Sequence, residues 1–287
     1  MARSSMRWGD PATLLSRAAW TGYWQLMQKY HRFEVRGLEH ILRLGRAMIV
    51  GYHGKPGARD MIMLQMLLLQ KYGQPTHAIA HDMIFHVPIL CHLAKGMELV
   101  SRDREAIAKI VARGEKLVVT PGGIEEAWST VTERYRLKWR RMGYLRLAIE
   151  HKLPIIPVVG VGSGDAFYAL YDAYRFWKPV WDRSKLPEGA GLYLGLGPLG
   201  LWPFTPPFPV RIVQFVGPPI DLEMTYGHID VDDRKALAVI HQKVTAIVQD
   251  MLDRARAEVT GRTTGPEFGE LRWVNQLGSK KQVASGR

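Results

Sequence analysis

Short apolar segments that alternate with amphipathic ones constrain the fold of this chain more than any other feature. AMIVGY, KLVVT, LPIIPVV and VRIVQFV are rich in β-branched residues and have the length of buried strands. Helical patterns occupy residues 60–72, 104–115, 143–152 and 232–259, between or after these strands. Strands that alternate with helices predict an α/β fold, a sandwich in which helices flank a largely parallel sheet.

The size of the chain suits one large core or two small ones, since it has 287 residues of which 47% are hydrophobic. Its composition changes towards both ends. We therefore expect an N-terminal amphipathic helix within residues 1–32, a main domain in residues 33–263, and a polar, basic tail in residues 264–287.

The charge of the chain favours anionic partners. Its 39 basic and 27 acidic residues give a formal net charge of +12, which attracts nucleic acid, acidic lipid headgroups or a phosphorylated ligand. The sequence has neither zinc-finger spacing nor an RNA-binding sheet motif. We therefore expect no specific nucleic-acid partner and favour a membrane surface or a phosphorylated ligand. The sequence indicates no oligomeric state.

Targeting signals and cysteine usage bear on the compartment. The N-terminal residues lack the apolar core and cleavage site of a signal peptide, and the run MIMLQMLLL is too short to span a bilayer. The single cysteine, Cys91, allows no internal disulfide, agrees with a reducing compartment, and is expected to pack in the core. We therefore expect a cytoplasmic protein that associates peripherally with a membrane.

Two segments each allow two interpretations. The helical pattern of residues 12–31 carries Trp20 and Trp24, and it fits either a helix packed on the core or an interfacial membrane helix. Residues 191–210 are rich in Gly and Pro. They form either an irregular packed connection or an apolar surface that meets acyl chains.

Motifs for common cofactors are absent or incomplete. GLGPLG, at residues 195–200, matches the text of a dinucleotide fingerprint, but the prolines that follow forbid the helix that such a site needs. His81, His86 and His92 lack the spacing of a zinc-binding helix. We therefore expect no bound cofactor and no metal site.

A histidine follows the apolar run AMIVGY at the carboxyl end of a predicted strand, where ligands gather in open α/β sheets. Gly54 and Gly57 relieve the turn after His53, and Asp60 begins the next helix. If the Asp60 carboxylate accepts from one ring nitrogen, the other nitrogen becomes a general base. The alternative is a satisfied loop histidine beside an Asp60 that caps the helix.

A second strand ends in the same way. KLVVT leads into a turn formed by Pro121, Gly122 and Gly123. This turn frees backbone N–H groups at a helix start, which are a ready site for an oxyanion or a thioester carbonyl. The alternative is an ordinary strand-to-helix turn. Two glycine-relieved strand ends, one bearing a base, suggest one shared active site. Because no protein nucleophile stands beside His53, the pattern indicates group transfer between two bound molecules.

These motifs resemble the glycerolipid acyltransferase superfamily, whose blocks include H-x4-D and a strand ending in P-E-G or P-G-G. The text GYHG, PGGIEEA and LKWRRMGYLRLA is similar to the diacylglycerol-acyltransferase-like branch, and so are FEVRGLEHI, the segment IFHVPILCHLAKGMELVSRDREAI and FVGPPIDL. The resemblance covers about residues 33–222. It implies the glycerol-phosphate-acyltransferase-like sandwich fold and transfer of an acyl group from a thioester.

The resemblance also assigns roles to single residues. His53 is the general base and Asp60 orients it. The acceptor and thioester are bound by residues of the other blocks: Gly54, Arg102, Arg104, Pro121, Gly122, Gly123, Glu125, Glu126 and Pro157. Two departures matter: the spacing from His53 to Asp60 is H-x6-D, and the third block lacks the arginine of P-E-G-T-R.

Together these observations predict an O-acyltransferase. The expected donor is acyl-CoA or an acylated carrier protein, used as a co-substrate, and the expected acceptor is a hydroxyl of a glycerolipid or another neutral lipid. The missing arginine favours a neutral acceptor such as a diacylglycerol or a long-chain alcohol. Two alternatives stay open: a lysophospholipid or lysophosphatidate acyltransferase, and a non-catalytic lipid-binding protein with the same fold, which the H-x6-D spacing favours.

Overall fold

The computed structural model describes residues 11–55 (only the backbone of 11–17), 57–80, 85, 98–184, 194–202 and 204–261. The predictions for Cys91, for His81, His86 and His92, and for the tail at 264–287 lie outside these residues.

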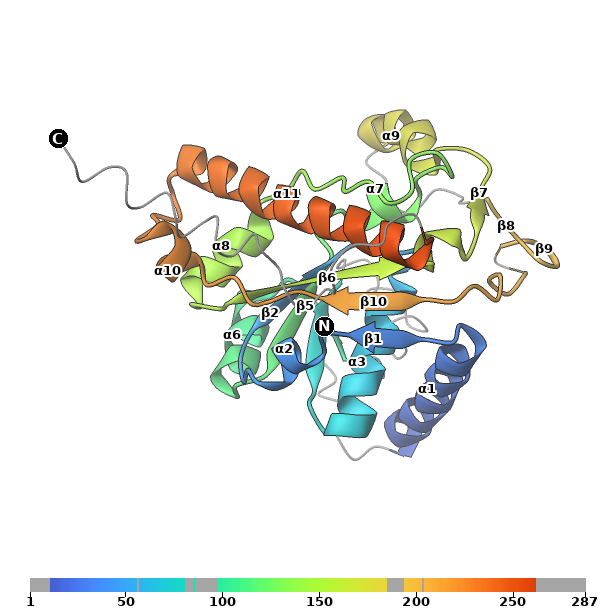
Figure 1. Ribbon diagram of the computed structural model, residues 1–287, viewed down its shortest axis with the longest axis horizontal. Coiled ribbons are helices and arrows are strands. Elements are labelled where there is room, and N and C mark those ends of the chain that lie inside the picture. The colour runs from blue at the N-terminus through green and yellow to red at the C-terminus, as the bar shows by residue number, and fades with distance from the viewer. Residues whose placement is uncertain are drawn as a thin grey trace.

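A seven-stranded sheet forms the centre of the molecule (Figure 1). Its strands, in spatial order, are β1 (Glu34–Arg36), β10 (Val213–Val216), β6 (Ile155–Val161), β2 (Met48–Gly51), β5 (Lys116–Val119), β3 (Thr76–Ile79) and β4 (Leu99–Val100). The five strands from β6 to β4 are parallel. Strand β10 runs antiparallel to β6 and pairs in parallel with β1. The predicted α/β fold with a largely parallel sheet is therefore confirmed.

Helices cover both faces of the sheet (Figure 1). Alternate side chains of the strands point to opposite faces, as in Met48, Val50 and Tyr52 against Ile49. The first set packs with α6 (Arg104–Ala112), α8 (Gly143–Glu150) and α11 (Arg234–Val259). The second set packs with α2 (Glu39–Leu42) and α3 (Arg59–Tyr72). The helices predicted from periodicity thus match α3, α6, α8 and α11.

The N-terminal helix α1 (Pro11–Tyr30) packs on α3. Trp24 is only 4% exposed and shares an apolar cluster with Met63 and Met66 of α3. Leu26, on another side of α1, is 60% exposed. The helix therefore packs on the body of the protein through one side and leaves apolar surface free on the other. None of the helices in the described ranges combines the length and the hydropathy that crossing a bilayer requires.

The Gly/Pro-rich segment around residues 194–202 is more regular than the sequence predicted. It forms a hairpin of β8 (Gly195–Gly197) and β9 (Gly200–Leu201), which joins β7 (Tyr168–Ala169) in a small antiparallel sheet. No helix begins at GLGPLG, whose residues form β8, the turn after it and the start of β9. The remaining elements are α7 (Gly123–Ala127), η1 (Ser163–Asp165), α9 (Ala173–Ser184) and α10 (Leu222–Tyr226).

Candidate active site

Two neighbouring parallel strands bring the predicted site residues to one edge of the sheet. Strand β2 ends at Gly51 and β5 ends at Val119, and Val50 lies beside Val119 in the register. His53 follows β2 by two residues, and the glycine turn at Gly122 follows β5 by three. Because parallel strands end at the same edge, both turns lie at the carboxyl end of the sheet.

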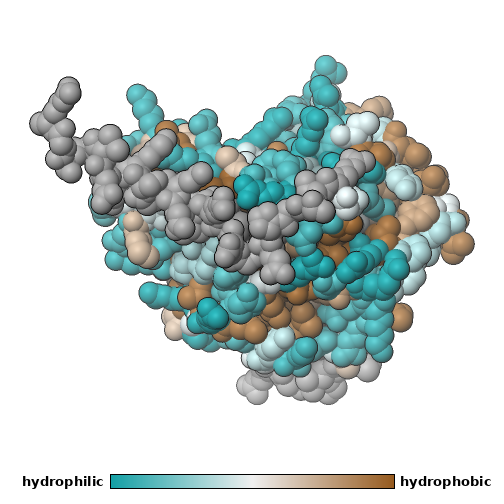
Figure 2. Space-filling view, viewed as in Figure 1, coloured by the Kyte–Doolittle hydropathy of each residue, from teal (hydrophilic) through white to brown (hydrophobic). Residues whose placement is uncertain are grey.

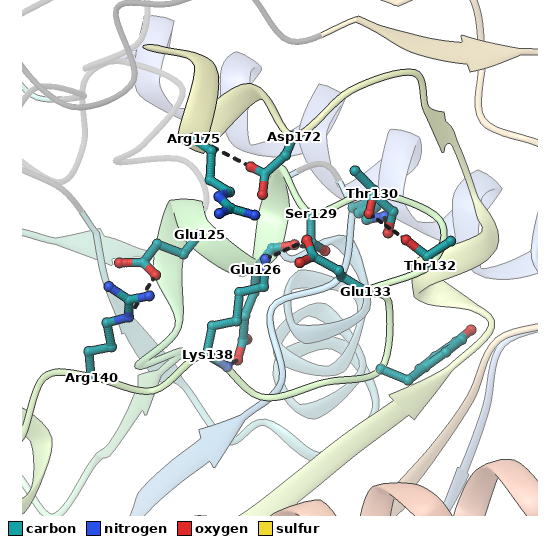
Figure 3. A network of polar contacts seen from close by, with 12 residues as sticks. Glu125, Glu126, Ser129, Thr130, Thr132, Glu133, Lys138, Arg140, Asp172 and Arg175 are labelled. Carbon is teal, nitrogen blue, oxygen red and sulfur yellow. Dashed lines mark hydrogen bonds and ion pairs between the residues drawn. The ribbon is translucent and has the colours of Figure 1, made fainter. Parts of the chain in front are cut away.

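Glu126 joins the two strand ends. Its carboxylate accepts one hydrogen bond from the backbone N–H of His53 and one from the backbone N–H of Lys138, both at 2.8 Å. Figure 3 shows Glu126 directed towards Lys138. The side chain is fully buried and reaches His53 because Gly122 has no side chain: a Cβ there would lie 2.0 Å from Glu126 Cδ. We call this arrangement the Glu126 clamp.

The ring of His53 is held in one tautomer by its own loop. Nδ1 lies 3.1 Å from the carbonyl oxygen of Gly54. A carbonyl oxygen only accepts, so Nδ1 carries the hydrogen and Nε2 keeps a free lone pair. Burial lowers the pKa of His53 to about 4, although the Gly54 carbonyl opposes this shift. The ring is therefore neutral at physiological pH and can accept a proton at Nε2.

Asp60 forms no hydrogen bond with this ring in the described part of the chain, so its orienting role stays a prediction. Neither carboxylate oxygen has a hydrogen-bond partner in the described part of the chain. The carboxylate is fully buried between two glycines, because a Cβ on Gly54 would lie 2.7 Å from Oδ1 and one on Gly160 would lie 2.1 Å from Oδ2. Burial raises the pKa of Asp60 to about 6, against the opposing effect of nearby amides and of the Gln214 and Ser163 side chains.

The backbone before α3 explains this placement. Gly57 and Ala58 both adopt left-handed conformations, with φ of 72° and 52°. Ala58 N donates to the Gly54 carbonyl at 3.1 Å, which closes the turn. The spacing H-x6-D is two residues longer than H-x4-D, and a left-handed turn accommodates the extra length. Asp60 then enters the core at the first turn of α3.

The third block is ordered by other contacts. Glu125 forms an ion pair with Arg140 at 3.2 Å (Figure 3). The N–H of Gly123 donates to the carbonyl of Thr120 at 3.0 Å, so it is already used within the turn. Of the two glycine N–H groups predicted to receive an oxyanion, only that of Gly122 is left for this role. Pro121 precedes them at the start of the same turn.

Three other predicted residues lie on β6, at the start of α6 and in the segment before α6. Arg104 is 86% exposed in its side chain and lies 4.0 Å from Glu150 of α8. Arg102 is exposed between β4 and α6. Pro157 is buried within β6 beside Val50, whereas the same register places His53 level with Gly160. Among the described residues, Arg104 forms no hydrogen bond or ion pair with His53.

Sequence reasoning missed Lys55, which is fully buried two residues after the histidine. Its Nζ donates to the carbonyl of Thr130 at 3.1 Å, and its backbone N–H donates to the carbonyl of Ser163 at 3.3 Å. Burial lowers the pKa of Lys55 to about 8, and the neighbouring charge of Arg134 adds to this effect. The only signal in the sequence was a lysine inside a strand-to-helix turn, where a solvated side chain is the usual expectation.

Tyr135 was also missed. It has φ of 64°, an uncommon value for a residue other than glycine. Its hydroxyl accepts from the N–H of Gly162 at 2.8 Å and donates to Asp165, while its own N–H donates to the Tyr52 hydroxyl at 3.2 Å. These bonds tie the segment after α7 to the ends of β2 and β6. Within the described ranges no group of three or more His, Cys, Asp or Glu could hold a metal ion.

Comparisons with known proteins identify this arrangement. Residues 32–161, from two residues before β1 to the end of β6, match the family model described as Acyltransferase. A mouse (Mus musculus) protein named DGAT1/2-independent enzyme synthesizing storage lipids is 28% identical over 236 residues, which cover 80% of this chain and 67% of the mouse protein. Over residues 32–161 the chain is similar to the acyltransferase family. The resemblance drawn from GYHG and PGGIEEA is thereby confirmed.

Other relatives extend the comparison. The human (Homo sapiens) protein of the same name is 26% identical over 232 residues, covering 78% of this chain and 67% of that protein. An uncharacterized protein of Mycobacterium tuberculosis is 28% identical over 239 residues, covering 80% and 63%. The chain thus spans about two thirds of the length of these relatives. The crystal structure of the 1-acyl-sn-glycerophosphate acyltransferase PlsC from Thermotoga maritima superposes with a TM-score of 0.47 and 15% identity, covering 88% and 89% of the two chains.

Proposed function

We propose that this acyltransferase moves a fatty acyl group from an acyl thioester, acyl-CoA or an acylated carrier protein, to a hydroxyl of a neutral glycerolipid or another neutral lipid. The observation that carries the proposal is the neutral His53 ring, with Nε2 free, at the strand end that the Glu126 clamp fixes. The names of the mammalian relatives, which refer to storage lipids, agree with a glycerolipid product.

In the proposed reaction His53 acts as a general base. Nε2 takes the proton of the acceptor hydroxyl as its oxygen attacks the thioester carbonyl carbon. The C–S bond then breaks, and the departing thiolate receives the proton from the imidazolium. In this step the N–H of Gly122 donates to the oxyanion that develops on the carbonyl oxygen. No covalent enzyme intermediate is needed.

A neutral acceptor is favoured over one with a phosphate group. Arg104 lies beside Glu150, and the Arg59 guanidinium stacks over Phe167 and donates to the Tyr23 hydroxyl. Arg134 and Lys138, which lie near Lys55, are paired with Asp165 and Glu133. Arg104, Arg134 and Lys138 thus have carboxylate partners within the chain, so they are less available to a phosphate on the acceptor, whereas Arg59 contacts neutral groups.

An acceptor panel tests this proposal. Purified protein is given radiolabelled acyl-CoA with diacylglycerol, a long-chain alcohol or lysophosphatidate, and the products are separated by thin-layer chromatography. We expect transfer to diacylglycerol or the alcohol at least tenfold faster than to lysophosphatidate. Faster transfer to lysophosphatidate would make the chain a lysophosphatidate acyltransferase, and vesicle binding without transfer to any acceptor would favour the lipid-binding alternative. We further propose that the protein is cytoplasmic and binds the membrane peripherally, since its lipid acceptors reside there.

The missing Asp60 hydrogen bond leads to a specific prediction. Asp60→Asn keeps the shape of the side chain and removes its charge. Because Nδ1 of His53 already donates to Gly54, we expect turnover to fall by less than about tenfold, far below the loss typical for a general base. Steady-state turnover at neutral pH measures this. A loss as large as that of His53→Ala would reinstate Asp60 as the partner of the ring.

The Glu126 clamp predicts a pH dependence of stability. Burial raises the pKa of Glu126 to about 8, so the folded chain keeps a proton that the unfolded chain releases near its ordinary pKa of 4.5. Stability therefore falls as pH rises through this window. Below about pH 6.5 the lowered pKa of His53 makes stability rise with pH, which opposes the effect of Glu126. The effect of Glu126 is therefore best measured between pH 6.5 and 8.

Urea unfolding at several pH values measures this effect. Between pH 6.5 and 8 we expect the wild-type free energy of unfolding to fall, by at most about 1.4 kcal/mol per pH unit for one proton. In Glu126→Gln the side chain does not titrate, so the slope should be correspondingly less negative. The same slope in both proteins would contradict a protonated Glu126.

A further inference from the structure

An exposed apolar face lies on the small sheet and on α9. Eight of the thirteen exposed large hydrophobic residues in the described part of the chain fall between residues 168 and 204. Phe204 is 90% exposed, Leu199 79% and Phe176 63%. Figure 2 shows hydrophobic surface gathered along the right-hand edge, where Figure 1 places β7, β8 and β9. We call this surface the β7–β9 face. It is formed by the exposed apolar residues of strands β7 to β9, of the β8–β9 hairpin and of α9.

The β7–β9 face rests on a packed foundation. Ala169 of β7 and Ala173 of α9 are buried, and Trp177 and Trp202 pack against them. The rings of Tyr171 and Phe176 meet edge to face, with centroids 5.4 Å apart. The exposed side chains therefore project from an ordered framework of α9 and the small sheet. A large apolar surface that a folded element holds in solvent marks a site of association.

Basic side chains border this apolar surface. Helix α9 carries Arg175, Lys178 and Arg183, all exposed, against one acidic residue, Asp182, which pairs with Lys178. Apolar side chains beside an excess of positive charge are what an anionic bilayer surface binds, since the former enter the headgroup region and the latter meet the phosphates.

The β7–β9 face is also continuous with the active site. Trp128 follows the last residue of α7, the helix that carries Glu126, and its ring packs on Trp181 of α9 at a centroid distance of 5.8 Å. On the other side, the carbonyl of Ser163 accepts a hydrogen bond from the backbone N–H of Lys55, which lies two residues after His53. Strand β7 begins five residues after Ser163. A bilayer bound at this face thus lies next to the elements that hold the base.

We propose that the β7–β9 face, with the basic residues of α9, docks this acyltransferase on an anionic bilayer and so brings lipid acceptors to His53. This deepens the proposed function and rests on it for the acceptor. The hairpin tip, with Leu199 and Phe204, enters the headgroup region, while Arg175 and Lys178 contact lipid phosphates.

Vesicle co-sedimentation tests the docking surface. The full-length protein is mixed with vesicles of phosphatidylcholine alone or with an equimolar mixture of phosphatidylcholine and phosphatidylglycerol. We expect stronger binding to the anionic vesicles and a decrease with added salt. The double variant Leu199→Ser/Phe204→Ser should bind the anionic vesicles at least about tenfold more weakly, since two exposed apolar side chains lose their burial in lipid.

Matched controls isolate the face from general hydrophobicity. Met224 of α10 and Val239 of α11 are also exposed apolar residues, at 76% and 50%, but lie outside the β7–β9 face. Met224→Ser/Val239→Ser should bind vesicles as the wild type does. Circular dichroism should show all three proteins equally folded, because every substituted side chain is solvent-exposed. Arg175→Gln/Lys178→Gln should lose most of the preference for anionic vesicles.

The outcomes separate docking from chemistry. Wild-type vesicle binding by Leu199→Ser/Phe204→Ser, or no binding by the wild type, overturns the docking proposal. If light scattering shows a wild-type dimer that only this variant dissociates, while vesicle binding is unchanged, the face joins two copies and the proposal also fails. On detergent-dispersed acceptor the variant should keep wild-type turnover. Absence of transfer by every protein, with vesicle binding lost only in the face variants, defeats the proposed function and leaves the docking surface standing.

Discussion

Turnover of His53→Ala is expected to be about 10² to 10⁴ times lower than that of the wild type, because the hydroxyl then attacks without a general base. The His53 ring makes a single hydrogen bond among the described residues, to the carbonyl of the adjacent Gly54. The Glu126 clamp holds the backbone N–H of residue 53 and not its ring, so alanine leaves the clamp in place. The fold should therefore survive the substitution. Steady-state transfer from acyl-CoA to the preferred acceptor, with an unfolding curve for each protein, provides the measurement.

A second histidine variant serves as the control. His151 caps the end of α8 through its backbone, and its side chain makes no hydrogen bond within the described part of the chain. His151→Ala should transfer acyl groups at the wild-type rate. If His53→Ala matched this control on its true substrates, another group would have to act as the base, and the proposed mechanism would fall.

The sequence predicted the edge of the sheet at which these residues meet. Apolar runs of strand length marked β2 and β5, and their glycine-rich ends marked the two turns. It did not reveal β3 (Thr76–Ile79), whose His77 is buried and bonds to Glu115 at 2.8 Å. A histidine inside a four-residue strand interrupts the apolar pattern on which strand prediction depends. Helix α9 was missed for a related reason, since Pro179 lies within it.

The partners of the site residues depended on details that no pattern carries. Asp60 follows a turn whose direction is set by left-handed φ values at Gly57 and Ala58, and alanine gives no sign of such a conformation. Of the adjacent Glu125 and Glu126, the first pairs with Arg140 near the surface and the second enters the core. The space beside Gly122 admits that second carboxylate, and this became visible only in three dimensions.

Gly122→Ala is expected to lower turnover by about 10²-fold, although it adds a single methyl group. The new Cβ would lie 2.0 Å from Cδ and 2.3 Å from Oε1 of Glu126, so the carboxyl group must move. When it moves, the half-buried backbone N–H groups of His53 and Lys138 lose their acceptor. The strand end that carries the base is then no longer fixed against the β5 turn. Displacement of a reacting group by about 1 Å can reduce a rate by this amount.

Two comparisons make this prediction specific to the clamp. Gly143→Ala, at the exposed start of α8, adds a methyl group with no atom within 4 Å, so it should leave turnover unchanged and raise stability by at most about 1 kcal/mol. Gly123→Ala also has open space, but φ of 49° strains the alanine, so we expect a loss of about 1 kcal/mol in stability with most turnover retained. Wild-type turnover in Gly122→Ala would mean that His53 keeps its position without Glu126. A large loss in Gly122→Ala beside a small one in Gly123→Ala would instead show that the third block acts by seating the Glu126 carboxylate beneath the catalytic loop.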